Sequence, residues 1–263
     1  MQWLGFVLMG VVIGGFGTLI GAGGGFILMP VLLLMSPKEE PEFLACISLA
    51  VVFFNAASGT IGYARQKMID YRAGLVFAAA TVPGAVIGAM VTSAIPRRGF
   101  DALLGSVLAL FAAYLLIKGK RLGDKGSNGN GHTPGEAPLS RGKMMLGAAV
   151  SFVVGFLSSL LGIGGGIVHV PLLVMLLGFP VHIAAATSHF VLAISAGSGT
   201  AVHIFNNAFA QGGTRRTILL GIGVIIGAQI GAHWSRRTPP GLILRGLGVA
   251  LLVAGGRILW MAM

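Results

Sequence analysis

The chain has 263 residues, of which 55% are hydrophobic and only 10% are charged, and its formal net charge is +11. Soluble domains carry about 25% charged residues, so water is not the main solvent of this surface. The basic residues flank apolar stretches and have no interleaved aromatic residues, which favours membrane anchoring and disfavours nucleic-acid binding.

The apolar residues fall into eight segments separated by polar breaks, and most segments approach the 20 residues that cross a bilayer as a helix. None alternates with the period of two that is typical of a transmembrane barrel. The first segment lacks the basic start of a signal peptide, so we expect it to stay as a membrane segment. The sequence predicts an all-α membrane protein with about eight transmembrane segments, at 3–35, 43–64, 73–94, 100–117, 144–177, 181–203, 217–234 and 241–261.

One polar break is much longer than the others. Residues 118–143 are rich in Gly, Ser, Asn, Pro and charge. Such a composition cannot bury a core, so it predicts a flexible linker, which its basic residues place on the cytoplasmic side. The linker divides the chain into a first helical repeat, 1–117, and a second, 144–263.

The two parts carry the same motifs in the same order. GAGGGFILMP from Gly21 to Pro30 returns as GIGGGIVHVP from Gly162 to Pro171. Three further matches follow at nearly constant spacing: Ala45–Ser48 with Ala185–Ser188, Ser58–Thr60 with Ser198–Thr200, and Gly84–Ala89 with Gly227–Ala232. We interpret this as internal duplication, which is typical of secondary transporters whose binding site lies between the repeats near the midplane.

Two topologies fit these repeats. In the first, each half has four segments and its first segment is broken at the glycine run; the halves are then parallel, and both termini and the linker are cytoplasmic. In the second, segments 3–35 and 144–177 each form a hairpin, which gives five-element inverted repeats. The count of Lys and Arg favours a cytoplasmic linker equally in both.

The glycine runs are the sharpest feature of the sequence: Gly23, Gly24 and Gly25, then Gly164, Gly165 and Gly166. Each glycine costs a helix about 1 kcal/mol relative to alanine, so the runs predict unwound backbone inside the membrane. A half-helix that starts after each run would offer free N–H groups and the positive end of its dipole to an anion. Close helix packing is the alternative, but packing motifs do not need consecutive glycines.

Several polar side chains accompany the glycine runs. Ser48, Thr187 and Ser188 occupy matching places in the two halves, where their hydroxyls could donate to an anion or to their own helix backbone. His169, His189 and His203 stand where the first half has Leu28, Leu49 and Tyr63. The first two are candidate substrate ligands, and all three are candidates for proton coupling, although a neutral histidine bonded between helices is an equal alternative.

What the spans lack is also informative. No Asp or Glu lies deep in any of them, which disfavours a cation path and leaves neutral or positive donors that suit an anion. Cys46 is the single cysteine, and no histidine pair has metal-ligand spacing, so we expect neither a metal nor a cofactor.

The doubled G-x-G-G-G-x₄-P motif, followed by the Ser48 segment and by Thr187-Ser188, resembles the sulfite exporter TauE/SafE family of membrane transporters. The resemblance covers nearly the whole chain outside the linker. It implies a bacterial-type inner-membrane protein that exports sulfite or an organosulfonate. The first half departs from the pattern with Cys46-Ile47-Ser48, and the second with His169 inside its motif.

We therefore expect a secondary transporter that is not an enzyme and that moves a small anion by alternating access. Its partners would be the anion, the bilayer, a coupling proton or sodium ion, and in a homo-oligomer other copies of itself. A channel-like anion conduit is one alternative. An intramembrane enzyme or assembly factor is another, because Ser195 or Ser198 could pair with His203.

Overall fold

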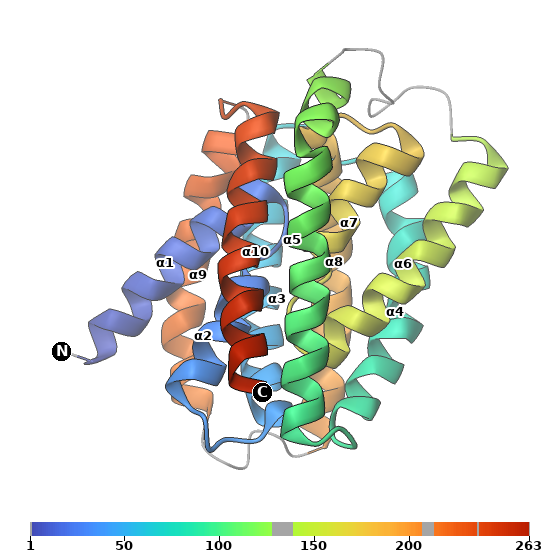
Figure 1. Ribbon diagram of the computed structural model, residues 1–263. Helices are drawn as coiled ribbons and strands as arrows, with labels where there is room; N and C mark the ends of the chain where they lie inside the picture. The colour runs from blue at the N-terminus through green and yellow to red at the C-terminus, as the bar shows by residue number, and fades with distance from the viewer. Residues whose placement is uncertain (1, 128–138, 207–212, 236, 263) are drawn as a thin grey trace.

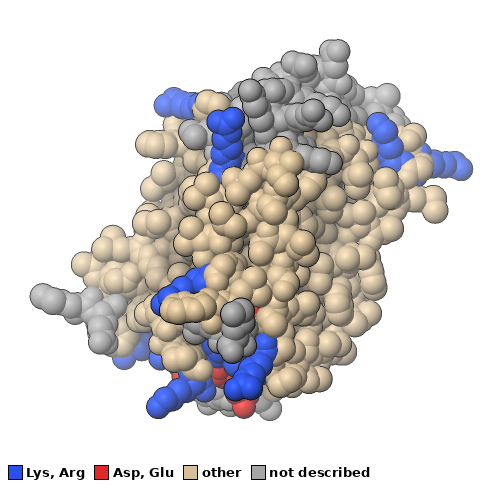
Figure 2. All heavy atoms as spheres, viewed as in Figure 1, with Lys and Arg blue, Asp and Glu red and all other residues tan. Residues whose placement is uncertain are grey.

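The computed structural model describes residues 2–127, 139–206, 213–235 and 237–262. Within these ranges the chain forms helices and no strand, and seven of the helices are long and apolar enough to cross a membrane. The expected all-α membrane protein is therefore confirmed. The charged side chains in view lie toward the two ends of the molecule, with an uncharged band between them (Figure 2).

In the described ranges, five helices lie before the linker and five after it. A π-helical turn extends one helix of the second set. The first set is α1 (Gln2–Ile20), α2 (Gly25–Met35), α3 (Pro41–Arg65), α4 (Tyr71–Thr92) and α5 (Arg97–Ser127). The second set is α6 (Arg141–Leu161), α7 (Gly166–Leu172) with its π-helical turn η1 (Leu173–Leu177), α8 (Val181–Phe205), α9 (Thr214–Ser235) and α10 (Pro240–Ala262).

The helices begin where the local chemistry favours a start. Pro41 opens α3, where its missing N–H costs nothing. The Asp70 carboxylate accepts a hydrogen bond from the Ala73 N–H at 3.0 Å and caps α4. Ser140 caps α6 in the same way through the Lys143 N–H. Gly162, in the left-handed conformation with φ 65°, ends α6.

Each glycine run turns the chain back on itself, so α1 with α2 and α6 with α7 form hairpins (Figure 1). Gly10 faces Gly223 and Gly15 faces Gly227, so α1 runs parallel to α9. The end of α2 lies where α9 begins, because Arg216 contacts the Ser36 hydroxyl at 3.2 Å. The structure therefore has five elements on each side of the linker where four-segment halves were expected, and it agrees with the five-element alternative.

The hairpins change which parts of the chain share a side. Trp3 stacks under Arg215, so the N-terminal end lies level with the start of α9. Both chain ends lie at the lower end of the bundle in Figure 1, whereas α5 ends and α6 begins at the upper end. The expectation that the termini share a side with the linker is therefore not met, because an odd number of passes separates them.

The expected linker at 118–143 is shorter in the structure. Helix α5 continues through Ser127, and α6 already begins at Arg141. Residues 128–138 of this stretch lie outside the described ranges.

Close glycine packing holds the outer helices together. A Cβ on Gly227 would overlap the carbonyl oxygen of Val11 in α1, and a Cβ on Gly84 would overlap that of Phe152 in α6. Small residues at these places let the membrane helices touch closely. The pairs α1–α9 and α4–α6 flank a central pair, α3 and α8, while α5 and α10 pack together on one side (Figure 1).

Candidate functional site

The two glycine breaks lie against each other at the centre of the molecule. A Cβ on Gly25 would overlap the carbonyl oxygen of Ile163, and a Cβ on Gly166 would overlap that of Gly21. Only glycine allows the two backbones to approach so closely. The halves thus meet through their unwound segments, as the sequence predicts.

The breaks use backbone conformations that side chains disfavour. Gly23 and Gly24 have φ of 77° and 78°, and Gly164 has φ of 68°. After the second break, hydrogen bonding resumes when Val168 and His169 donate to the Gly165 carbonyl at 3.1 and 2.9 Å. Within the described ranges, the N–H groups of 164–167 have no acceptor. They are donors without partners at the start of the apolar helical stretch Gly166–Leu177.

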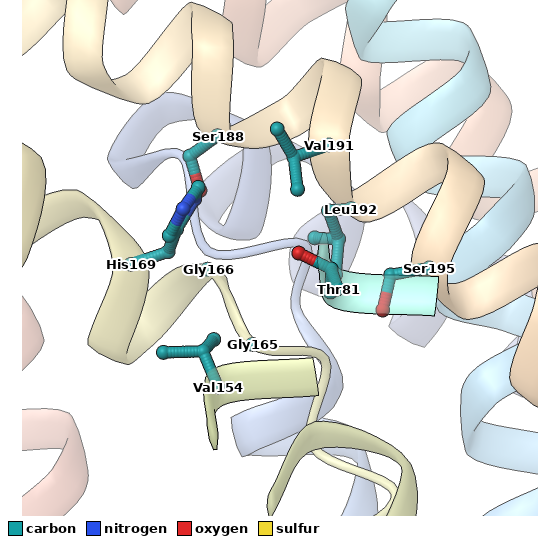
Figure 3. Close-up of a pocket in the computed structure, with 9 residues that line it drawn as sticks. All are labelled: Thr81, Val154, Gly165, Gly166, His169, Ser188, Val191, Leu192 and Ser195. Carbon is teal, nitrogen blue, oxygen red and sulfur yellow. The ribbon is translucent and has the colours of Figure 1, made fainter. Parts of the chain in front are cut away.

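A small cavity lies beside the second break. Its volume of about 10 Å³ is room for about one water molecule. Figure 3 shows the lining side chains of α4, α6, α7 and α8 around the glycine backbone. They are Thr81, Val154, Gly165, Gly166, His169, Ser188, Val191, Leu192 and Ser195.

Two hydroxyl groups of α8 give this cavity its polar character. Ser188 and Ser195 are 0% and 2% exposed, and neither hydroxyl has a hydrogen-bond partner within the described ranges. They are seven residues apart, so two helical turns place them on the same face. A buried hydroxyl without a partner costs about 1–3 kcal/mol. Both hydroxyl groups can therefore donate a hydrogen bond to a group bound in the cavity.

His169 is the third polar side chain at the cavity. Its Nε2 lies 3.0 Å from the Ser151 hydroxyl, which also donates to the Gly147 carbonyl at 2.7 Å. The ring of Phe77 packs edge-on against the imidazole. His169 is thus held in place by neighbours on α6 and α4 while its ring borders the cavity.

The matching place in the first half has different side chains. Leu28 lies where the second half has His169. The Ser48 hydroxyl, unlike that of Ser188, donates a hydrogen bond to the Gly162 carbonyl at 2.5 Å. The breaks are therefore alike in backbone but unlike in their surroundings. Gly23, Gly24 and Gly25 support the centre of the molecule without lining the cavity.

Three other candidates from the sequence lie away from the cavity. Thr187 accepts a hydrogen bond from the Asp70 N–H at 3.1 Å. The Nε2 of His189 lies 3.1 Å from the Thr18 hydroxyl, in a buried group with Asn55 and Tyr63. His203 lies near the far end of α8, and neither ring nitrogen has a hydrogen-bond partner within the described ranges. The suggested pairing of His203 with Ser195 or Ser198 is therefore not formed.

The sequence interpretation missed five of the lining residues: Thr81, Val154, Val191, Leu192 and Ser195. Ser195 could have been found, since it lies two turns from Ser188 on one helix face. Thr81 comes from α4 and reaches the cavity only through tertiary packing, for which the sequence carries no local signal.

Comparisons with known proteins find membrane transporters that match nearly the whole chain. The family model described as "Sulfite exporter TauE/SafE" matches residues 6–258. The probable membrane transporter protein YunE of Bacillus subtilis is 30% identical, over 99% of this chain and 98% of its own length. A probable membrane transporter protein of Methanocaldococcus jannaschii is 25% identical over 89% of this chain and 86% of its own. No solved structure matches the chain significantly.

Proposed function

Because the chain belongs to the sulfite exporter TauE/SafE family of membrane transporters, we propose that it exports a small sulfur-containing anion, sulfite or an organosulfonate, by alternating access. The observation that carries the proposal is the cavity where Ser188 and Ser195 present buried hydroxyls without partners beside the glycine backbone.

The donors around the cavity fit a sulfur oxyanion. Sulfite and sulfonates present three oxygens, each of which accepts hydrogen bonds. The hydroxyls of Ser188 and Ser195 on α8 and the free N–H groups of Gly165 and Gly166 at the start of α7 supply donors from two elements. Hydrogen bonds to a charged acceptor are about twice as strong as those between neutral groups, and more so away from water. No cationic side chain is needed, which keeps the empty site stable within the membrane.

The size of the cavity requires movement. An oxyanion of sulfur is several times larger than the single water molecule that the cavity can hold. Binding therefore requires α7 to move away from α8. Inverted repeats that meet at their broken elements supply such a motion, because each half can open toward one side of the membrane in turn.

The orientation follows from basic residues. The connections at the end of the bundle where α5 ends carry more Lys and Arg than those at the opposite end, and we infer that this end is cytoplasmic in a bacterial-type inner membrane. Both chain termini would then face the opposite side.

Counterflow in liposomes tests the proposed function. Purified protein preloaded with unlabelled methanesulfonate or sulfite should accumulate the labelled anion transiently against its gradient, because a carrier exchanges its solutes. A channel-like conduit would equilibrate the label without overshoot, and a membrane enzyme would not move it at all.

Two variants and a matched control locate the site. Ser188→Ala and Ser195→Ala should each raise the half-saturating anion concentration about tenfold, the effect of losing one charged hydrogen bond. Ser198→Ala is the control on the same helix, because its hydroxyl only bonds the Ile194 carbonyl at 2.9 Å. Unchanged saturation in both cavity variants would refute the site.

A further inference from the structure

A polar hollow opens at the end of the bundle that carries the chain termini. It has a volume of about 360 Å³ and lies between the α2–α3 connection and the α4–α5 connection. The charged side chains that line it are Lys38, Glu39, Glu40, Glu42 and Arg97. Figure 2 shows basic and acidic side chains gathered at this end. Water and protons can therefore reach Glu42.

Behind the hollow, Glu42 meets a buried histidine. The Nδ1 of His203 lies 3.6 Å from the Glu42 carboxylate, and the side chains are 0% and 20% exposed. Within the described part of the chain, both ring nitrogens of His203 and one carboxylate oxygen of Glu42 lack a hydrogen-bond partner. The pair thus joins a fully buried imidazole to a carboxylate that solvent can reach.

The same helix links this pair to the anion cavity. Ser195 and His203 are eight residues apart on α8, about 12 Å along its axis and about 80° apart around it. Gly199 lies between them, and a Cβ there would come within 2.6 Å of the Ser159 hydroxyl, another buried group without a partner within the described ranges. Buried polar side chains are therefore found beside α8 between the cavity and the pair.

We propose that Glu42 and His203 bind a proton that is carried together with each anion. The inference rests on the proposed transport function and names its coupling ion. Without the proton the pair carries one net negative charge; with it, the pair is neutral, whichever residue holds the proton. Removing a unit charge about 12 Å from the anion, at an effective dielectric constant of about 20, strengthens anion binding about tenfold.

Other charged groups lie at this end of the bundle in the described ranges: Lys38, Glu39 and Glu40 line the hollow, Arg98 follows Arg97 on α5, and Arg215 and Arg216 lie in the first turn of α9. Cys46 follows Glu42 by one turn of α3, and on α5 Asp101 is paired with Arg97 at 2.9 Å. The charged residues of α4 and α6 lie toward the opposite end of the bundle: Arg72, Arg141 and Lys143. Glu42 is the acid whose carboxylate is paired with His203, at 3.6 Å.

Coupling to one proton makes the transport of a monovalent anion electroneutral. The membrane potential would neither drive nor oppose it, and net transport would follow the combined concentration gradients of the anion and the proton. Removing the potential with a potassium ionophore should therefore leave the rate unchanged.

The test follows the internal pH of liposomes that contain the full chain, with methanesulfonate as the probe, since this anion holds no proton near neutral pH. A pH dye should report one proton entering with each anion. Transport that moves no proton, or that requires sodium, overturns the proposal. Counterflow of labelled methanesulfonate needs no net proton movement. Loss of counterflow would therefore contradict the proposed transport function, whereas loss of proton movement alone would contradict the coupling.

Variants assign the proton to the pair. In His203→Gln and Glu42→Gln, counterflow should persist while proton movement and the tenfold dependence of anion affinity on pH are lost. Glu42→Asp should restore part of both. His233→Gln is the matched control, an exposed histidine at the end of α9. Proton movement that persists in both Gln variants overturns the assignment.

Discussion

At the residue scale, two serines in matching places illustrate how the halves differ. Ser48 and Ser188 are both 0% exposed, yet Ser48 bonds the Gly162 carbonyl at 2.5 Å and Ser188 has no partner within the described ranges. The sequence singles out both serines as candidate ligands but does not indicate which hydrogen bonds their hydroxyls make. Their roles depend on which carbonyl each hydroxyl meets, and that is decided by packing between the halves.

This difference predicts opposite effects of the same substitution. Ser48→Ala should lower the free energy of unfolding by about 1–3 kcal/mol, because the Gly162 carbonyl is left unsatisfied. Ser188→Ala should leave it unchanged or raise it, since a buried group without a partner is removed. Thermal unfolding in detergent, without anion, measures both. Equal losses in the two variants would contradict the roles assigned here.

The second break depends on glycine at position 164. A residue with a side chain would have to adopt the left-handed conformation there, which costs about 1–2 kcal/mol. Its Cβ would also lie 2.8 Å from Val52 Cγ1. Gly164→Ala should therefore lower the melting temperature by several degrees. Gly5→Ala serves as the control, because nothing lies within 4 Å of a Cβ there. A melting temperature unchanged in both variants would show that the break tolerates a side chain.

At the element scale, the sequence predicts the broken helices but not the direction of the chain after the break. Three glycines and a following proline explain why a helix stops. The apolar pattern is compatible both with a chain that continues across the membrane after the break and with one that turns back as a hairpin. The hairpin results from tertiary contacts, in which the unwound backbones of the two halves meet. The cavity was predictable only in part, since Thr81 and Val154 come from neighbouring helices.

The pairing of α1 with α9 makes a prediction about helix packing. Gly227→Ala should destabilise the protein by about 1–3 kcal/mol, because the new Cβ overlaps the Val11 carbonyl and pushes the helices apart. Gly256→Ala on α10 has open space and should be neutral or slightly stabilising. Thermal unfolding of the two variants checks this. If Gly227→Ala melts no lower than Gly256→Ala, the close approach of α1 and α9 is not as described.

At the scale of the whole molecule, the five-element halves place the connections differently from eight full crossings. Lys38 and Arg215 lie at one end of the bundle, and Lys67 and Lys143 lie at the other. Four-segment parallel halves would put Arg215 with Lys67. The count of basic residues cannot separate these arrangements, because the loops of the second half exchange places between them.

Labelling of single cysteines separates the two topologies. In a Cys46→Ser background, Lys38→Cys and Arg215→Cys should react with an impermeant maleimide from the same side of the membrane. Lys67→Cys and Lys143→Cys should react only from the other side. Reaction of Arg215→Cys together with Lys67→Cys would restore the four-segment arrangement.

The most direct test of the central claim is a structure of the protein with bound selenite, a heavier analogue of sulfite whose selenium can be located by anomalous scattering. The selenium should lie between α7 and α8, with its oxygens within hydrogen-bond distance of the Gly165 and Gly166 N–H groups and of the Ser188 hydroxyl. Selenite bound elsewhere, with the cavity still closed, would contradict the account.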